Sequence, residues 1–598
     1  MAIERKRECK GLSPQLLRTS TSIDRLFVKV GCEALACNLA MFSQLLPHGG
    51  ISFGALSLFL VGAVWIWFTA KRQGLEKVAN AGRIPPTFPS VFPLLGSLPI
   101  AYLFNPKGFV LDKKNFFQSR HPTRVRILHQ EFYIVRGPEN VKALFKGSWA
   151  CTSIPFVKFA LGHAFGLPTR ALSLFDKDDS GGNHVPHPDS TVEARNRIDY
   201  RVHESLVRFL EGKGLPPFWN RFADNITQRL HTLRGRIGSD WAYHPDLMKL
   251  IGDEATVSIL NALCGPYFLA LNPDFLDSFW NFDRNLQTYL QGIPWFLAPR
   301  AYADREKALN AVKAWQQHAR DHFTESAIDA DGDDPYWGCS FFRERHKMFL
   351  EMDGFDYAAI ASQDFGAIWA ARNSVTATSW AIFDIYRDPE LLASVRAEVD
   401  SCRIDTANEN TPVKFDIERL FRLPVLQAVY AETLRLRMHF YIIRMPDRVD
   451  MKIRDWVIPR RKVIVTPTTV AHMDSEAWNN ERPLDQFWIG RFLKYPPTNT
   501  CEASKSQDNA PMFSTKDVEG SWIPYGGGPR QCPGRHFAKR QILLTTVLIV
   551  SLFDIEILRE GLNAKEDFSL NGFGGGVSHS AGKIPVRIRR RQEGQARD

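Results

Sequence analysis

Residues 525–534 have the sequence Tyr525-Gly-Gly-Gly-Pro-Arg530-Gln-Cys532-Pro-Gly534, in which a single cysteine stands between glycines. Gly528 and Gly534 carry no Cβ, so we expect them to let the backbone bend closely around a bound group, with backbone N–H groups facing the sulfur. Arg530 offers a permanent charge that suits a carboxylate. A thiolate in this setting is a ligand for haem iron. For the cysteine alone, the alternative is a surface turn with a structural thiol.

The composition is that of a large globular chain. It has 598 residues, of which 44% are hydrophobic and 23% charged, enough for an extensive core. Its 9 cysteines form no C-x-x-C pair, which argues against a disulfide framework or a structural zinc site and fits a reducing compartment. After the cysteine motif, residues 538–552 are mostly apolar and predict a helix buried behind the cofactor.

The cysteine segment resembles the F-x-x-G-x-R-x-C-x-G signature of the cytochrome P-450 haem-thiolate monooxygenases, with Tyr525 at the Phe position. The resemblance extends over about residues 80 to 590. It implies a mainly α fold with a small β region, and haem b whose iron is ligated axially by Cys532. It also implies that Arg530 and Arg444, together with Gly528, Gly534 and Tyr525, surround the cofactor, with Arg444 turned toward a propionate.

Further motifs of the family occur in the right order. Glu432-Thr-Leu-Arg435 matches E-x-x-R, and Arg491 stands in Ile489-Gly-Arg491-Phe492 where the family has P-E-R-F. The resemblance implies a buried cluster of Glu432, Arg435 and Arg491, in which one carboxylate between two guanidiniums keeps the buried charges paired. A lone E-x-x-R on a helix is more often a solvated face, but its place about a hundred residues before the cysteine favours the cluster.

The segment 364–380 is apolar and predicts one helix, which in the family crosses the distal haem face with an acid and an alcohol for proton delivery. Aligned on Ala377-Thr378-x-Trp380, the acid position holds Arg372 and the alcohol position Asn373. This pattern resembles the branch with the sterol 7-alpha and 12-alpha hydroxylases and prostacyclin synthase.

Asn373 can both donate and accept hydrogen bonds, so our hypothesis is that it orients oxygen or water, assisted by the Ser374 hydroxyl. The alternative is that both side chains satisfy backbone groups in a kinked helix. No W-x-x-x-R motif is evident for contact with a second propionate. The helical segment 201–210, with His203, is the candidate for that contact instead. Phe365, Trp369 and Phe440 are candidate cavity liners.

The N-terminal part predicts a membrane anchor. Residues 51–70 form a stretch of twenty residues without charge, the length of a bilayer-spanning helix. A buried core helix or a signal peptide is the alternative. Lys71, Arg72, Lys77 and Arg83 follow the stretch, so the positive-inside rule places the catalytic part in the cytosol. The resemblance implies the endoplasmic reticulum membrane, crossed once.

We therefore divide the chain into an N-terminal extension (1–50), the anchor (51–70), a basic and Pro-rich linker (71–96) and a haem-thiolate catalytic domain (97–598). Residues 27–47 are an additional apolar stretch, an interfacial helix or a second span. Prolines in residues 83–96 favour an extended connector. Residues 176–192 and 494–520 are polar and predict surface loops.

The formal charge of +10 suggests an acidic partner. No basic patch interleaved with aromatic residues is evident, so we expect no nucleic acid. Arg530, Arg535, Lys539 and Arg540 favour an NADPH-cytochrome reductase docked on the thiolate side; an ordinary solvated face is the alternative.

The expected function is monooxygenation of an apolar small molecule in secondary metabolism, a terpenoid, sterol, polyketide or indole alkaloid. A reductase-independent isomerase or dehydratase acting on a peroxide is the other possibility. A catalytically inactive haem protein that serves as a ligand carrier ranks below both.

Overall fold

The computed structural model describes residues 84–88, 105–111, 120–127, 130–404, 412–495, 510–569 and 572–592. The chain divides into two units, residues 1–74 and 75–598, and everything described belongs to the second. The predicted N-terminal extension, the anchor at 51–70 and the apolar stretch at 27–47 lie outside the described residues. None of the helices in the described part combines the length and the apolar composition needed to cross a bilayer.

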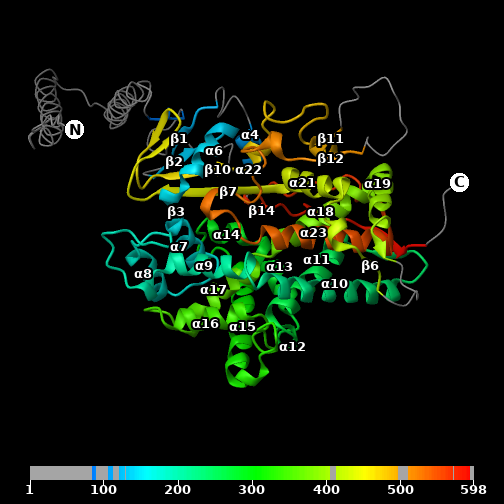
Figure 1. Cartoon of the computed structure of the whole chain (residues 1–598), viewed down its shortest axis with the longest axis horizontal. Coiled ribbons are helices and arrows are strands. Elements are labelled where there is room, and N and C mark those ends of the chain that lie inside the picture. Colours follow the sequence, from blue (N-terminus) through cyan, green and yellow to red (C-terminus); the bar gives the residue numbers. More distant parts are fainter. Residues whose placement is uncertain are drawn as a thin grey trace, which may run out of the picture. The chain divides into compact units, whose positions relative to one another are not determined.

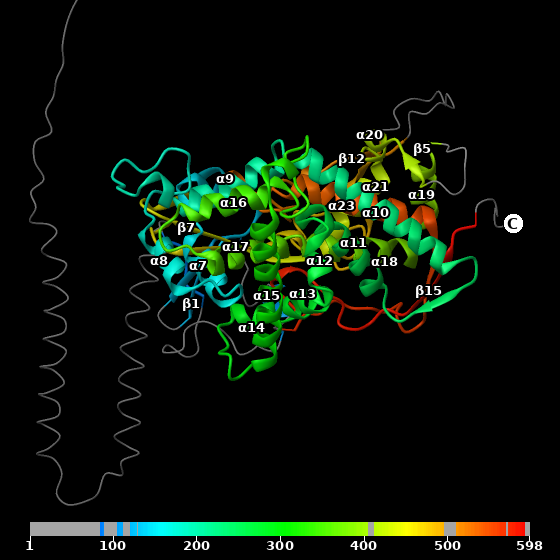
Figure 2. The ribbon, with the colours of Figure 1, turned by 90° about the horizontal axis from the view of Figure 1, so that it is seen from below.

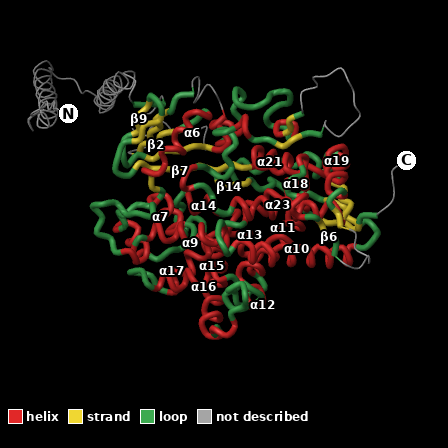
Figure 3. The backbone as a smooth tube through the Cα atoms, in the orientation of Figure 1, coloured by secondary structure: helices red, strands yellow, loops and turns green. Residues whose placement is uncertain are grey.

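Helices are the main secondary structure of the described residues, as Figures 1 and 3 show. They are α4 (Pro106–Leu111), α6 (Pro138–Gly147), α7 (Ile154–His163), α8 (Thr169–Lys177), α9 (Ile198–Leu210), α10 (Leu215–Ile237), α11 (Leu247–Cys264), α12 (Tyr267–Leu271), α13 (Phe275–Arg284), α14 (Leu286–Leu290), α15 (Pro299–His322), α16 (Ser340–Leu350), α17 (Tyr357–Trp369), α18 (Arg372–Arg387), α19 (Pro389–Asp400), α20 (Ile417–Leu420), α21 (Pro424–Arg437), α22 (Thr468–His472) and α23 (Arg535–Leu552).

The strands are short and form several small sheets. They are β1 (Thr123–Ile127), β2 (Gln130–Ile134), β3 (Cys151–Thr152), β4 (Ala242–His244), β5 (Arg403–Ile404), β6 (Lys414–Phe415), β7 (Met438–Pro446), β8 (Met451–Ile453), β9 (Trp456–Ile458), β10 (Val463–Pro467), β11 (Leu493–Lys494), β12 (Met512–Phe513), β13 (Phe553–Ile557), β14 (Gly575–Val577) and β15 (Val586–Arg590). The largest sheet has the order β1-β2-β10-β7-β14, with β3 also paired to β7. The expected mainly α fold with a small β region is confirmed.

The core is built around helices that are apolar on nearly every face. In α23 the residues from Gln541 to Leu552 are all buried, as expected of a helix that is hydrophobic all round. This confirms the helix predicted for residues 538–552, which begins three residues earlier. α18 is also almost wholly buried and packs against α11, α21 and α23, and Figure 2 shows these helices side by side.

The single helix predicted over residues 364–380 is wrong, because the chain breaks between α17 and α18 at Ala370 and Ala371. Side-chain hydroxyls bond backbone carbonyls on the C-terminal side of this break. Ser374 Oγ donates to the carbonyl of Ala371 at 3.0 Å, and Thr376 and Thr378 make the same kind of bond to carbonyls four residues back. Such bonds compete with the helical ladder and bend helices.

The predicted linker is described only at residues 84–88. There Thr87 forms a bridge with Arg124 of β1, and its hydroxyl accepts from Arg124 Nε at 2.8 Å. This part of the linker therefore packs against the sheet. The predicted loop at 494–520 contains β12, which pairs with β11, while residues 496–509 lie outside the described part.

Candidate functional site

The Cys532 thiol stands at the start of α23, on a loop whose turns require glycine. Gly528 has φ +70°, and a Cβ there would lie 2.5 Å from the carbonyl oxygen of Phe145. The backbone N–H of Cys532 donates to the Tyr525 carbonyl at 3.0 Å and closes the loop. Among the cysteines of the described residues, Cys532 alone is exposed, which makes this thiol accessible to a ligand.

The surroundings of the sulfur are suited to a bound thiolate. The side chain is accessible, yet the dense protein around it raises the pKa of the Cys532 thiol; the backbone amides of Gly534 and Arg535 act in the opposite direction. These amides face the sulfur at the first turn of α23, as the sequence predicts. A bound metal ion would complete the deprotonation.

Gly534 does not have the bend expected of it. Its φ is −73°, and a Cβ would make only ordinary contacts, 3.7 Å from Leu210 and 3.8 Å from the Cys532 sulfur. The protein alone therefore does not require glycine here; a methyl group would stand beside the sulfur. Tyr525 lies on the loop, and its hydroxyl accepts from Tyr430 at 3.0 Å. Burial raises the pKa of Tyr525 well above its usual range, so the ring stays neutral.

Arg444 is a buried guanidinium with an incomplete set of partners. It is 7% exposed and donates to the carbonyls of Ile443 at 2.9 Å, Gly527 at 3.4 Å and Arg530 at 3.3 Å. Its Nε has no hydrogen-bond partner, and no carboxylate of the described residues pairs with it. Burial lowers its pKa. Asp450, six residues on, is exposed. Arg444 is therefore placed to receive an anionic group beside the thiol loop.

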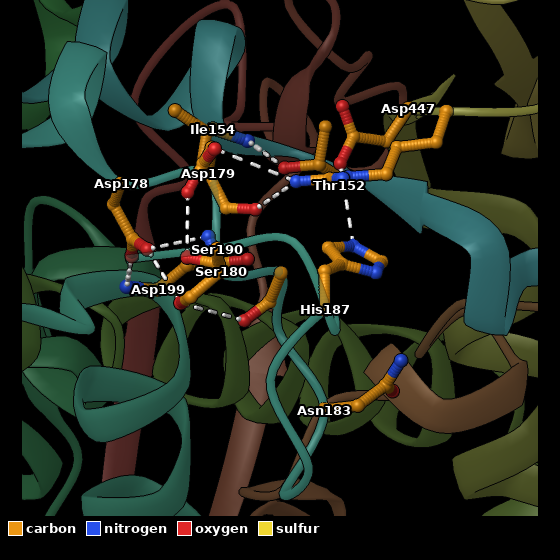
Figure 4. Close-up of polar contacts among 12 residues, drawn as sticks. Thr152, Ile154, Asp178, Asp179, Ser180, Asn183, His187, Ser190, Asp199 and Asp447 are labelled. Carbon is orange, nitrogen blue, oxygen red and sulfur yellow. Dashed lines mark hydrogen bonds and ion pairs between the residues drawn. The ribbon is translucent and has the colours of Figure 1, made fainter. Parts of the chain in front are cut away.

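Arg530, in contrast, already has a carboxylate partner that the sequence did not reveal. Its Nη2 lies 2.7 Å from Asp199 Oδ2, at the start of α9. Burial raises the pKa of Asp199, while Arg530 acts against this. Figure 4 shows how the polar segment predicted as a surface loop folds against Asp199: Asp178 accepts from the backbone N–H of Asp199 at 3.1 Å and from the Ser180 hydroxyl at 2.6 Å. His187 also lies 3.5 Å from Asp447.

The segment proposed as a second propionate contact points elsewhere. Arg201 pairs with Glu351 at 2.7 Å, and Arg208 pairs with Glu204 on the same helix. Both arginines line a cavity of about 790 Å³ between α9, the turn after it and α16, which contains none of the predicted site residues. His203 is the exception, because it bonds the backbone of Pro529 in the thiol loop; burial lowers its pKa, so it is neutral.

Glu432, Arg435 and Arg491 lie together in the interior. Arg435 donates to both oxygens of Glu432, at 2.7 and 2.8 Å, and Arg491 Nε lies 3.4 Å from Glu432 Oε1. The remaining guanidinium donors bond backbone carbonyls of residues 472–484, and all three side chains are fully buried. The cluster fastens α21 to this segment, and α21 also carries Tyr430, the partner of Tyr525.

Asn373 and Ser374 are both bonded to the protein's own backbone. Asn373 Oδ1 accepts from the Val577 N–H at 2.9 Å, and the Ser374 hydroxyl bonds the Ala371 carbonyl. The bonding of Ser374 matches the alternative of a backbone contact in a kinked helix, whereas Asn373 bonds the backbone of a distant strand, β14. Of the proposed cavity liners, Phe365 is fully buried among other rings, Trp369 donates to Asp283 at 2.7 Å, and Phe440 is 39% exposed.

Residues 574–576 are a part of the site that the sequence argument missed. Gly574 and Gly576 have φ +93° and +133°, and a Cβ on Gly576 would collide with Asn373 Oδ1. The run Gly574-Gly575-Gly576 was the available signal. It permits β14 to lie against the first turn of α18.

The donor set defines a class of protein. An accessible thiol facing backbone amides, together with a buried arginine whose Nε is unpartnered, fits a haem held by a thiolate and a propionate contact. Cys532 would ligate the iron and Arg444 would hold a propionate. Haem with this ligation supplies oxygen chemistry, and the protein supplies binding and orientation. The fold and the site thus define a haem-thiolate protein.

Comparison with known proteins identifies the family. The cytochrome P450 family model matches residues 266–574. The cytochrome P450 monooxygenase efuG of Hormonema carpetanum is 31% identical over 91% of this chain and 96% of its own length. The cytochrome P450 monooxygenase fsoE of Humicola fuscoatra is 31% identical over 94% and 99%. The 25-hydroxycholesterol 7-alpha-hydroxylase of Rattus norvegicus is 28% identical over 41% and 58%. The chain belongs to the cytochrome P450 family and is a monooxygenase that uses cysteine-ligated haem iron.

Proposed function

We propose that this monooxygenase oxidises an apolar small molecule, a terpenoid, sterol, polyketide or indole alkaloid, in secondary metabolite biosynthesis, with O2 and electrons from NADPH delivered by a reductase. The observation that carries the proposal is the accessible Cys532 thiol held against the amides at the start of α23. The two fungal relatives are monooxygenases by name and match nearly the whole chain. The rat relative acts on 25-hydroxycholesterol by name, which supports a large apolar substrate.

The direct test of the haem ligand is a pair of cysteine substitutions. Cys532→Ser should abolish the absorbance band that a cysteinate-ligated haem gives with carbon monoxide after reduction. Cys402→Ser is the matched control, because Cys402 is buried, and it should retain the band. Retention of the band in Cys532→Ser would remove the foundation of the proposal. Metabolite profiles of host cells with and without the enzyme, grown under 18O2, should then reveal the product and its labelled oxygen.

The reductase partner is supported by basic side chains next to the thiol loop. Arg540 lies over the Trp219 ring, and Lys539 donates to Gln427 at 2.7 Å. Part of the predicted positive surface is neutralised, since Arg530 pairs with Asp199 and Arg535 with Glu211. We expect Arg540→Glu to slow reduction by the reductase at low salt and to have less effect at high salt. An equal rate at low salt would argue against docking on this face.

A second candidate function is a reductase-independent isomerase or dehydratase acting on a peroxide. It is favoured by the guanidinium of Arg372 at the family's acid position and by the commitment of Asn373 and Ser374 to backbone groups. An isomerase or dehydratase should turn over without NADPH or reductase. Assays of the purified enzyme with and without both components, on the substrate found by metabolite profiling, separate the two functions.

The proposed location is the endoplasmic reticulum membrane, crossed once, with the catalytic domain in the cytosol. The support is the uncharged stretch at 51–70 and the basic residues that follow it. Protease treatment of sealed microsomes should degrade the catalytic domain. Protection of that domain would reverse the proposed orientation.

A further inference from the structure

A buried carboxylate at the end of α13 is contacted by polar side chains from three other segments. Asp283 Oδ1 lies 2.9 Å from Arg372 Nε, and their side chains are 0% and 4% exposed. Trp369 Nε1 donates to the same oxygen at 2.7 Å, and His579 Nε2 lies 2.5 Å from Oδ2. Burial alone would raise the pKa of Asp283, but Arg372 and His579 lower it to about 2. The carboxylate is therefore charged at neutral pH and fixed in place.

The other edge of the Arg372 guanidinium holds β14. Its Nη1 donates to the Val577 carbonyl at 2.6 Å, and Nη2 to the Gly575 carbonyl at 3.3 Å. The neighbouring Asn373 accepts from the Val577 N–H at 2.9 Å. The first turn of α18 thus binds both the donor and the acceptor of Val577. We call the set Asp283, Arg372 and Asn373 the α18–β14 latch.

The latch joins two elements that are both connected to the thiol loop. β14 pairs with β7, with Gly575 opposite Phe440, and β7 carries Arg444 to the carbonyls of Gly527 and Arg530. α18 packs along α23, where Gln541 donates to Thr378 at 3.1 Å. Figure 1 shows α18, α23, β14 and β7 adjacent at the centre of the unit. A shift of α18 against β14 would therefore displace elements that adjoin a haem bound at the thiol loop.

A guanidinium cannot give up its proton in a protein, so Arg372 cannot serve as a proton donor. We propose that Arg372 and Asp283 are positioning residues of the oxygenase, which hold the first turn of α18 against β14 and thereby fix the shape of the space that the substrate enters. This inference rests on haem binding at Cys532 and is independent of the substrate class proposed above. A purely structural ion pair is the competing explanation.

The chain offers a matched control for that competing explanation. Arg345 Nε lies 2.9 Å from Asp364 Oδ1, and the two side chains are 2% and 0% exposed. The pair joins α16 to α17, and its other polar partners are the side chains of Ser205 and Gln316. It equals the Arg372 pair in distance and burial, and none of these hydrogen bonds reaches β14. Arg345→Gln should therefore reduce stability as Arg372→Gln does, without altering the walls around the haem.

The test compares a bulky and a small azole as probes of the full-length holoenzyme. Titrations of 4-phenylimidazole and imidazole, followed by their optical difference spectra, give two dissociation constants for each variant. If the contact between α18 and β14 is loosened, the protein is in the conformation that binds the bulky probe only part of the time, which raises the apparent Kd of that probe. We expect Arg372→Gln and Asp283→Asn each to raise the Kd of 4-phenylimidazole about tenfold and that of imidazole less than about twofold. The double variant should be no worse than either single variant.

The controls separate the possible failures. Arg345→Gln should leave both constants within about twofold of the wild type. An unchanged ratio of the two constants in Arg372→Gln, or an equal change in Arg345→Gln, would overturn the proposal. If Arg372→Gln does not fold, Arg372→Lys retains the charge and should raise the 4-phenylimidazole constant about threefold; no change there would also overturn it. The carbon monoxide spectrum, recorded first, shows separately whether haem binding itself has failed, which would refute the premise.

Discussion

Replacing Glu432 by Gln should destabilise the protein far more than the same replacement at the surface. Glu432 receives Arg435 Nε on one oxygen, and on the other Arg435 Nη2, Arg491 Nε and the Trp488 N–H, all without exposure to water. The amide of Gln can present only one acceptor oxygen. If that oxygen replaces Oε1, the NH2 group faces Arg435 Nε, a donor, at 2.7 Å.

The expected magnitude follows from the uncompensated charge. Removing one partner of a buried ion pair costs about 3–5 kcal/mol, and here one carboxylate balances two guanidiniums. Such a loss is a large share of the ~5–15 kcal/mol that stabilises a typical domain. The control is Glu556→Gln: Glu556 pairs with Arg587 at 2.5 Å, but both side chains are nearly half exposed. That pair contributes about 0–1 kcal/mol.

The assay is chemical denaturation of the holoenzyme, followed by tryptophan fluorescence and by the carbon monoxide band. Glu432→Gln should lower the denaturation midpoint strongly, and Glu556→Gln should leave it nearly unchanged. Glu432→Asp, which keeps the charge on a shorter side chain, should be intermediate and covers the case in which the amide variant does not fold. Equal midpoints for Glu432→Gln and Glu556→Gln would refute the compensation argument.

Three further outcomes are expected. Gly528→Ala should destabilise the thiol loop by about 1–3 kcal/mol and reduce haem content, because φ is +70° and the added Cβ meets the Phe145 carbonyl. Gly534→Ala should instead keep the fold and change the haem spectrum. Asn373→Ala should cost about 1 kcal/mol of stability, because the Val577 N–H loses its acceptor, and should uncouple electron use from product formation while the thiolate spectrum is retained. Coupled turnover equal to that of the wild type would reject a role for Asn373. Ser374→Ala should have little effect. The pKa of Asp283 is lowered from 3.8 to about 2, so the charged carboxylate stabilises the folded protein above pH ~4, and this contribution is lost as the pH falls toward ~2. Acid titration of Asp283→Asn should lack that loss of stability. Identical acid-unfolding midpoints for the variant and the wild type would contradict this prediction.

The residues themselves predicted the thiol loop and the buried helix after it, whereas the burial of the charge cluster came from the family resemblance. The helix after Cys532 is apolar on every face, and E-x-x-R puts Glu432 and Arg435 on one face of a helix one turn apart. Arg491 enters the same cluster from a segment more than fifty residues later, and the family motif, not the residues, indicated its position.

Long-range pairing decided what the sequence could not. Asp199, on α9, pairs with Arg530 although the two residues are more than three hundred positions apart, and no spacing rule connects them. Beside the break before Arg372 lie the Ser374–Ala371 bond and the Arg372–Asp283 ion pair. A count of apolar residues shows neither contact, so it predicted an unbroken helix instead. Most of the polar segment 176–192 is at the surface, as its composition predicts, but Asp178 and Ser180 are buried against α9.

The nine residues of β7 have a consequence for sequence change in this protein. The strand pairs with β14 through Phe440, with β10 through Arg444 and with β3 through Pro446, and its even-numbered residues from 442 onward are buried. Inserting or deleting one residue between Phe440 and Arg444 would turn every later side chain to the opposite face. The guanidinium beside the thiol loop would then exchange places with Ile443. Length variation in this stretch is therefore excluded for any variant that keeps the cofactor, whereas surface loops elsewhere are free to lengthen.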